Sequence, residues 1–423
     1  MKIPFTTELN LKLHDLTRRY NKACVLNSNG YKSKYSKFEF VFAYSNNEKF
    51  NNLISFSEFS ELVEKSNKWV ITALSYDLKN EFENLTSKNS DSIKFPLIDA
   101  FCPDLLIIVN EGFAEILYPE KETERMKIFN QLQIQTISDS EINPTPTINL
   151  KPLLTKDKYL KKIEQIKKHI QAGDIYEMNF CMEFLATNYS IDPYRLYQHL
   201  NKIAPAPFSC FYKSNEHFVL STSPERYLQK SGNKIISQPI KGTIERVLDK
   251  SEDKLQQNRL ATDPKERSEN VMIVDMVRND LSRTATKGSV QVEELFGIYQ
   301  FKHVHQMIST ITSNLKSEFT LSDVIKTSFP MGSMTGAPKI KAMELIEKYE
   351  ASKRGIYSGT IGYIDEKQNA DFNVIIRSII YNSENKKLSF QVGSAITIAS
   401  DPEKEYEECM LKAKGMLMAL EEK

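Results

Sequence analysis

Residues 263–281 have the sequence DPKERSENVMIVDMVRNDL and predict a helix with acidic side chains on one face. The segment opens with Asp-Pro, a pair that is typical of the first positions of a helix. Four side chains are spaced three, four and three residues apart and therefore share a face, namely Glu266, Glu269, Ile273 and Met276. The two carboxylates continue a stripe that becomes apolar, which favours a site at the edge of the core. The alternative is an ordinary solvated first turn, stabilised by the helix dipole.

A second acidic helix is predicted over 401–420, where the sequence is DPEKEYEECMLKAKGMLMAL. It also opens with Asp-Pro, and it places Glu405, Glu408 and Lys412 in one row. An apolar row runs beside this one and consists of Cys409, Ala413, Met416 and Leu420. Two acidic rows that face each other form a cage of hard oxygen ligands, which Mg²⁺ prefers. The alternative is a pair of exposed acidic turns.

The third chemically informative segment is residues 238–247, with the sequence QPIKGTIERV. We expect a turn that sets Lys241 beside a glycine, where the backbone can approach a ligand closely. Because most lysines in turns are merely solvated, this segment alone indicates little.

The rest of the chain predicts a mixed α/β protein. Stretches such as FEFVFAY (38–44) and WVITAL (69–74) are typical of strands. Apolar residues at helical spacing predict a helix over 159–170 that stops at Gly173. Hairpin-like gaps outnumber βαβ units, which favours antiparallel sheets.

One proline-rich stretch divides the chain. It predicts a connector over 141–154, between an N-terminal lobe over 1–140 and a C-terminal region over 155–423.

Composition excludes several classes of protein. The formal net charge is +1, from 56 basic and 55 acidic residues, which gives no electrostatic case for nucleic acid or an anionic membrane as partner. The five cysteines form no CxxC pair, which argues against a disulfide framework or a zinc site and favours a reducing compartment. The N-terminus lacks a leader pattern, and apolar runs are too short to span a membrane. We therefore expect a soluble, cytoplasmic protein.

Six motifs occur in an order and spacing that closely resemble the chorismate-utilising enzymes. That family includes the anthranilate synthase large subunit and the aminodeoxychorismate, isochorismate and salicylate synthases. The resemblance is dense from about residue 156 to residue 416 and thinner before it. The motifs are STSPERYL (221–228), PIKGT (239–243), DPKERSENVMIVDMVRNDLSR (263–283), FPMGSMTGAPKIKAMELI (329–346), YSGTIGY (357–363) and EYEECMLKAKGM (405–416).

The resemblance implies an α/β (α+β) fold. In this fold two interleaved lobes carry antiparallel β-sheets packed face to face, with helices outside. The N-terminal lobe is then a divergent version of the one in anthranilate synthases, and 155–423 is the chorismate-binding catalytic region. The two parts are not expected to be independent domains.

The resemblance also implies a site. Glu269 and Glu408 match glutamates through which Mg²⁺ bridges to a substrate carboxylate, and Glu266 and Glu405 match acids close by. The remaining matches hold the substrate: Lys412, Arg377 and Tyr357 at its carboxylates, Ser333 and Thr243 through hydroxyls, and Gly393 through its backbone.

Lys241 distinguishes between members of the family. Anthranilate synthases have alanine at this position, whereas PIKGT resembles the aminodeoxychorismate pattern, in which the lysine amine attacks C2 as the C4 hydroxyl leaves. Because the amine must be neutral to attack, we expect its pKa to lie below the ordinary value of roughly 10.4. Glu225 matches a carboxylate that can protonate the leaving hydroxyl.

Two positions depart from the family pattern. Glu177 stands where water-adding relatives carry a lysine and where the amino-transferring relatives usually carry glutamine, and its role is open. Gln306 stands where family members often carry a histidine that serves pyruvate elimination. If this stretch is helical, the adjacent His305 points about 100° away and cannot substitute.

The leading hypothesis is therefore synthesis of 4-amino-4-deoxychorismate from chorismate and ammonia, with Mg²⁺, on the route to p-aminobenzoate and folate. An anthranilate synthase component I and a non-catalytic chorismate-binding subunit are the alternatives. None of the cysteines has the Gly-x-Cys-x-Gly setting that resembles an amidotransferase nucleophile. Ammonia from glutamine is thus expected to require a separate glutaminase subunit.

Overall fold

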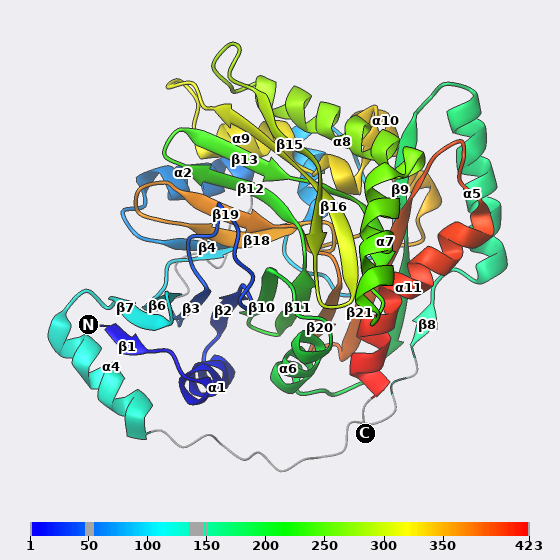
Figure 1. Ribbon diagram of the computed structural model, residues 1–423. Coiled ribbons are helices and arrows are strands. Elements are labelled where there is room, and N and C mark those ends of the chain that lie inside the picture. The colour runs from blue at the N-terminus through cyan, green and yellow to red at the C-terminus, as the bar shows by residue number, and fades with distance from the viewer. Residues whose placement is uncertain (1, 47–54, 135–147, 149, 422–423) are drawn as a thin grey trace.

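Two large antiparallel sheets lie face to face at the centre of the molecule, with helices around them (Figure 1). The computed structural model describes residues 2–46, 55–134, 148 and 150–421. Within these residues the two sheets are accompanied by eleven α-helices. The predicted fold class and the antiparallel pairing are confirmed.

The larger sheet, which we call sheet A, contains twelve strands among the described residues. In spatial order they are β1 (Lys2–Pro4), β7 (Phe113–Tyr118), β6 (Leu105–Asn110), β3 (Phe40–Ser45), β2 (Lys22–Asn27), β10 (Phe208–Ser214), β11 (His217–Ser223), β20 (Ser378–Asn382), β21 (Lys387–Ile396), β9 (Glu177–Thr187) and β17 (Gly336–Ala337), with β8 (Lys151–Pro152) also paired to β9.

The second sheet, sheet B, contains nine strands among the described residues. In spatial order they are β14 (Ile240–Glu245), β16 (Val304–Asn314), β13 (Lys234–Gln238), β12 (Arg226–Ser231), β19 (Ala370–Asn373), β18 (Thr360–Ile364), β4 (Val70–Leu74) and β5 (Ile98–Phe101), with β15 (Gln291–Gln300) paired to β16.

Alternating side chains of sheet A enter two different cores. Val41 and Ala43 of β3 belong to the core shared with sheet B, whereas Phe42 between them belongs to the core under the outer helices. Cys181 and Phe180 of β9 divide in the same way. Because successive residues of a strand point to opposite faces, the strand pattern produces both cores at once.

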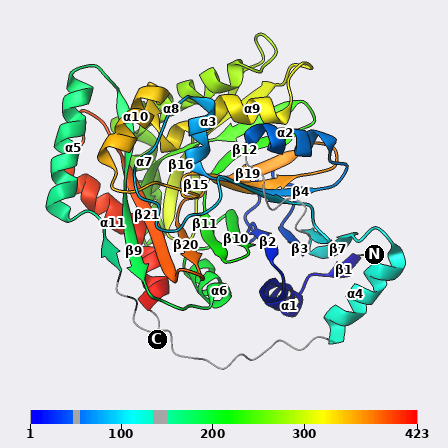
Figure 2. The same cartoon turned by 180° about the vertical axis from the view of Figure 1, so that it is seen from behind.

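Helices cover the outer faces of both sheets, and the view from behind confirms this arrangement (Figure 2). Six of the described helices contribute to the core on the outer face of sheet A: α1 (Thr7–Leu16), α4 (Glu122–Ile134), α5 (Lys156–Gln171), α6 (Pro193–Ile203), α10 (Lys339–Tyr349) and α11 (Pro402–Glu421). The others are α2 (Phe56–Lys65), α3 (Lys79–Phe82), α7 (Lys250–Thr262), α8 (Pro264–Ser282) and α9 (Leu321–Ser328).

The N-terminal and C-terminal parts of the chain share both sheets. In sheet A, β2 pairs with β10, and in sheet B, β4 pairs with β18. The interleaving implied by the family resemblance is therefore present. Most of the predicted connector, 141–154, lies outside the described residues; its last part forms β8, which runs beside β9. The division at 141–154 stays a prediction.

Both acidic helices begin at the predicted Asp-Pro pairs. The Asp263 carboxylate accepts a hydrogen bond of 3.0 Å from the backbone N–H of Glu266, and Asp401 accepts one of 3.1 Å from Lys404. These caps satisfy N–H groups that a helix end leaves free. The predicted helix over 159–170 is also confirmed, as α5, and Gly173 follows it with φ +82°.

Two local predictions are wrong. The expected turn at 238–247 is the strand β14, whose pairing with β16 is irregular between Ile240 and Thr243, where Gly242 has φ +96°. The stretch around His305 is not helical but forms β16, because its β-branched residues favour a strand. Adjacent side chains there point to opposite faces.

None of the helices that the structure describes combines the length and the apolar character needed to cross a membrane.

Candidate active site

Ion pairs of one lysine side chain, Lys265, connect the two acidic helices, α8 and α11. The Lys265 ammonium lies 3.4 Å from Glu405 Oε1 and 3.8 Å from Glu269 Oε1. Glu269 and Glu405 are buried, and one oxygen of each, Oε1 of Glu269 and Oε2 of Glu405, has no hydrogen-bond partner among the residues that the structure describes. The predicted meeting of the two acidic rows is therefore present, with an internal cation between them.

Burial and the charges of neighbouring side chains shift the pKa values of these acids. Burial raises the pKa of Glu269 to about 7, although Lys241 and Lys265 oppose the shift. Burial, together with the charge of Glu408, also raises the pKa of Glu266. The pKa of Glu408 is lowered, because Lys412, at 2.6 Å, and the other nearby lysines outweigh its burial.

These donors fit a hard divalent cation. Carboxylate oxygens are the protein ligands that Mg²⁺ prefers. The carboxylates of Glu269 and Glu405 both lie within 4 Å of the Lys265 ammonium, and each has one buried oxygen without a hydrogen-bond partner among the described residues. In the described part of the chain, no three His, Cys, Asp or Glu side chains converge as a ready-made cage. Mg²⁺ commonly binds one or two carboxylates and takes its other ligands from water and substrate, so such a cage is not required.

Lys241 lies beside an acid that the sequence left without a role. Its Nζ is 3.3 Å from Oε1 of Glu177, and the two residues are only 9% and 1% exposed. Lys241 comes from β14 of sheet B, whereas Glu177 is the first residue of β9 in sheet A. The pair therefore connects the two sheets.

The expected direction of the Lys241 pKa is wrong. Burial acts to lower this pKa, but the carboxylates of Glu177, Glu269 and Glu408 together raise it above the ordinary lysine value. The surrounding negative charge stabilises the ammonium form more than burial destabilises it. Attack by this amine therefore requires a group that removes its proton.

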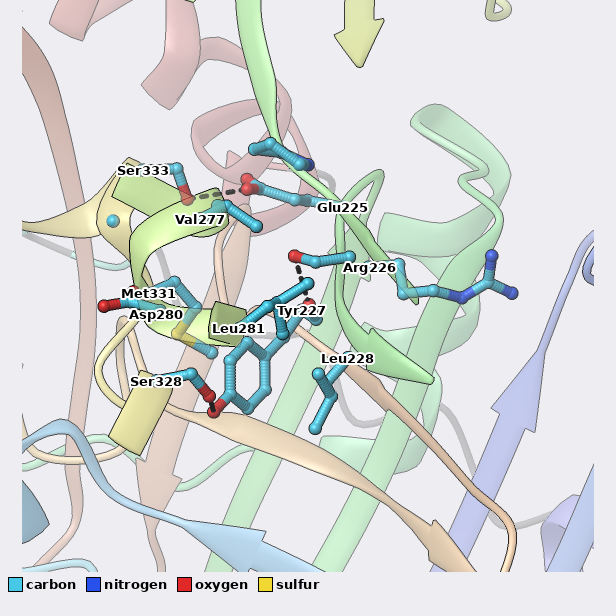
Figure 3. Close-up of a pocket in the computed structure, with 13 residues that line it drawn as sticks. Glu225, Arg226, Tyr227, Leu228, Val277, Asp280, Leu281, Ser328, Met331 and Ser333 are labelled. Carbon is cyan, nitrogen blue, oxygen red and sulfur yellow. Dashed lines mark hydrogen bonds between the residues drawn. The ribbon is translucent and has the colours of Figure 1, made fainter. Parts of the chain in front are cut away.

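Glu225 and Ser333 face one another at one end of a small pocket (Figure 3). The Ser333 hydroxyl donates a hydrogen bond of 2.6 Å to Glu225 Oε1. Burial raises the pKa of Glu225 to about 7, against the stabilising effect of Ser333, the backbone and two lysines. Such a carboxyl group can hold or release a proton near neutral pH.

The pocket in Figure 3 extends from Glu225 toward Tyr227 and Ser328, and the Arg226 side chain points away from it. Among the predicted site residues it includes only Glu225 and Ser333. Residues from the C-terminal half of α8 also line it, but the four glutamates of the two acidic rows and Lys241 do not, so it is a side pocket of the candidate site.

A group of basic and hydroxyl side chains lies near Glu408. Lys412 Nζ donates to the Gly393 carbonyl oxygen at 2.9 Å and pairs with Glu408. Burial lowers the pKa of Arg377, while the nearby Tyr357 and Glu408 act in the opposite direction. The Arg377 guanidinium makes no hydrogen bond or ion pair with the other described residues. This guanidinium is therefore available to bind an anion.

Close packing leaves no room for a side chain at Gly393. A Cβ atom at this position would lie 2.5 Å from Cys181 Sγ and 2.7 Å from the Phe180 carbonyl oxygen. The strand β21 therefore lies tightly against β9 where Lys412 binds the Gly393 carbonyl. Tyr357 is buried beside the same cysteine, with its Oη 3.9 Å from Cys181 Sγ.

Thr243 differs from the other predicted ligands. It is exposed on β14 and pairs through its backbone with Gln306, and no hydrogen bond joins its hydroxyl to another described residue. His305 is fully buried and binds Asp253 of α7, with 2.9 Å between Nε2 and Oδ1. His305 therefore points away from the face that carries Gln306.

Two residues of this cluster were missed from the sequence. Glu177 showed only as a departure from the family pattern, and Lys265 gave no signal beyond its place beside Glu266. The helical spacing of Lys265 and Glu269, four residues apart, was the available clue.

Comparisons with known proteins agree with this geometry. A family model described as "chorismate binding enzyme" matches residues 21–418. The aminodeoxychorismate synthase component 1 of Klebsiella aerogenes is 35% identical over 347 residues, which cover 82% of this chain and 76% of the relative. An anthranilate synthase component I-like protein of Synechocystis sp. is 34% identical over 349 residues, or 82% of this chain and 72% of the relative.

Among solved structures, anthranilate synthase component I from Streptococcus pneumoniae superposes with a TM-score of 0.79 at 25% identity. The match covers 92% of this chain and 93% of the other. The similar identities of the two sequence relatives do not distinguish their two reactions.

Proposed function

The chain belongs to the chorismate-binding enzymes, and on that premise we propose that it makes 4-amino-4-deoxychorismate from chorismate and ammonia. The observation that carries this proposal is the position of Lys241. Its amine is buried, lies 3.3 Å from Glu177 and is close enough to the acidic helices for Glu269 and Glu408 to affect its pKa. A lysine in this position is a nucleophile available at the substrate site.

Chorismate carries two carboxylates, which four glutamates would repel. Arg377 is close enough to Tyr357 and Glu408 for both to affect its pKa, and its guanidinium has no hydrogen bond or ion pair with the other described residues. An arginine can bind a carboxylate through two hydrogen bonds. Lys412 adds a positive charge. Tyr357, Ser333, Thr243 and the backbone of Gly393 complete the proposed set of substrate contacts.

The proposed chemistry replaces one difficult substitution by two easier ones. The Lys241 lone pair forms the bond to C2, the ring double bonds shift, and the C4–O bond breaks. Glu225 gives its proton to the departing hydroxyl, which leaves as water. Ammonia then adds at C4, the double bonds shift back, and the C2–Nζ bond breaks with its electrons returned to the lysine.

Enzymes of this family are generally Mg²⁺-dependent, and we propose Glu269 and Glu408 as the ligands, with Glu266 and Glu405 beside them. When bound, the ion would neutralise a substrate carboxylate and the acids around it. The role of the protein is to hold these carboxylates together at the ends of two capped helices.

Product identification tests the proposal. The purified protein is incubated with chorismate, Mg²⁺ and an ammonium salt, and the products are separated and identified by mass. Aminodeoxychorismate supports the proposal. Anthranilate with pyruvate would establish the other reaction found among its relatives, and unchanged chorismate that still binds would indicate a non-catalytic subunit.

A further inference from the structure

Glu177 is the acid with the most direct contact to the proposed nucleophile. Its Oε1 lies 3.3 Å from Lys241 Nζ, and its Oε2 is buried and has no hydrogen-bond partner within the described part of the chain. Leaving a buried carboxylate oxygen unpaired costs free energy, so this arrangement is not explained by folding alone.

The Lys241 amine is attracted from two directions. Glu177 approaches it from sheet A, and the other carboxylates that act on its pKa, Glu269 and Glu408, belong to the helices α8 and α11. A lysine side chain has a flexible four-carbon stem and follows the local field. Without Glu177, the amine would turn toward the acidic helices.

We infer that Glu177 is a positioning residue that holds the Lys241 amine at C2 of the substrate and thereby excludes other nucleophiles from that carbon. The inference rests on the proposed function. Water and ammonia are both present during turnover, and each could add at C2. An amine held there by an ion pair occupies the position first and restricts ammonia to C4.

The same contact accounts for the protons of the reaction. The surplus proton of Lys241 passes to Glu177 Oε1 as the Nζ–C2 bond forms. It returns when ammonia adds at C4 and the C2–Nζ bond breaks. The ammonium group formed at C4 gives one proton to the Glu225 carboxylate, which restores the general acid. Chorismate and ammonia thus yield product and water with both carboxyl groups returned to their starting states.

The test uses the full chain with Glu177→Gln, Glu177→Ala and, as a matched control, Glu183→Gln. Glu183 is a buried glutamate of the same strand that binds Ser389 rather than Lys241. Each protein is incubated with chorismate, Mg²⁺, ¹⁵N-ammonium and ¹⁸O-water. Mass spectrometry then locates the labels in the products, and KM for chorismate is measured in parallel.

We expect wild type and Glu183→Gln to place nitrogen at C4 alone. The Glu177 variants should turn over more slowly, by tenfold or more for alanine on an order-of-magnitude basis. They should divert a measurable share of product to C2-labelled compounds, with KM for chorismate changed by less than about threefold. The product ratio is measured per turnover, so a partly unfolded variant still reports it.

Unchanged product ratio and rate in both Glu177 variants would overturn the inference. If C4-aminated product is absent even with the wild-type chain, the proposed function fails, and this inference fails with it. The wild-type reaction thus separates the two failures.

Discussion

Burial and the neighbouring negative charges shift the pKa of the Lys241 amine in opposite directions. Burial alone would lower the pKa and make the amine reactive, but three carboxylates raise it. The reactive form is therefore made by transfer of the proton to a neighbour, and not by desolvation of the lysine. Whether the amine can lose its proton in this way depends on which residue lies opposite it.

Replacing Lys241 tests the covalent route. Lys241→Ala should lose most aminodeoxychorismate formation while chorismate binding remains nearly intact, because the amine serves the chemistry. Lys241→Arg should be no better, since a guanidinium stays protonated. Steady-state rates and equilibrium binding of chorismate are measured on both variants. Full activity of the alanine variant at saturating ammonia would exclude the route.

Glu225 predicts a pH dependence. Its pKa of about 7 means that the proton needed by the leaving hydroxyl is lost as the pH rises through that value, so the rate of hydroxyl loss should fall there. Because this pKa is raised on folding, the folded chain binds more protons than the unfolded chain between the ordinary glutamate value and about 7, and the contribution of Glu225 to stability falls with rising pH in that window.

Glu225→Gln should remove the alkaline limb from the pH–rate profile, at a much lower rate throughout. It should also reduce the loss of melting temperature between pH 5 and pH 8, values chosen to bracket the window. The two measurements are independent. A variant with the wild-type profile would show that another group supplies the proton.

At the scale of the elements, the ends of α8 and α11 bring like charges together. Two Asp-Pro caps start these helices, and Lys265 forms ion pairs with an acid of each. A divalent cation would stabilise this arrangement by replacing repulsion with coordination.

Removal of one ligand tests the metal site. Glu269→Gln or Glu408→Gln should raise the Mg²⁺ concentration needed for activity and weaken chorismate binding by a similar factor, because the ion bridges protein and substrate. Calorimetric titrations of each variant with Mg²⁺ and chorismate measure both effects. A wild-type Mg²⁺ titration would remove that residue from the proposed ligands. Ca²⁺ should support activity poorly, since its coordination is larger and looser.

Gly393 and Gly415 form a contrasting pair. Gly393→Ala should lower the free energy of unfolding by about 1–3 kcal/mol, because its Cβ would lie 2.5 Å from Cys181 Sγ and force β21 away from β9. In the Gly415→Ala control, within α11, the added Cβ would lie 3.8 Å from the Ala204 side chain, an ordinary contact, and the substitution should stabilise by about 0.5–1 kcal/mol. Urea denaturation of both variants provides the measurement. Equal stability of the two would show that β21 can move.

At the scale of the whole molecule, the site is assembled from segments far apart in the chain. Strands of the N-terminal part lie within both sheets, so the core under the site contains both parts of the chain. The described residues are taken up by the two sheets and the helices that cover them, and we propose that the amino donor is prepared by another protein.

The amino donor gives the last prediction. Purified alone, the chain should form product from ammonium salts and none from glutamine. Addition of a class I glutaminase subunit that binds it should restore glutamine use, with ammonia passed to the site. Product formation with each nitrogen source is measured with and without that subunit. Glutamine-dependent turnover by the single chain would contradict the proposed partner.

The sequence alone determined much of the local structure and supplied the candidate residues of the proposed site. Helical spacing and Asp-Pro caps predicted α5, α8 and α11, and short apolar and aromatic stretches predicted strands such as β3 and β4. These features depend on hydrogen bonds and side-chain directions within a few residues, so a local pattern is sufficient to predict them. The family motifs added the order of the site residues.

Only the tertiary structure decided which of these residues meet. Glu177 and Lys241 belong to different sheets, and no spacing within the chain indicates their contact. The same holds for the strand β14 (Ile240–Glu245) and for His305, whose conformations follow from pairing with distant strands. Strand pairing and burial are nonlocal, and they also determine the direction of each pKa shift. The sequence therefore predicted a neutral lysine, whereas the fold surrounds that lysine with acids and stabilises its charge.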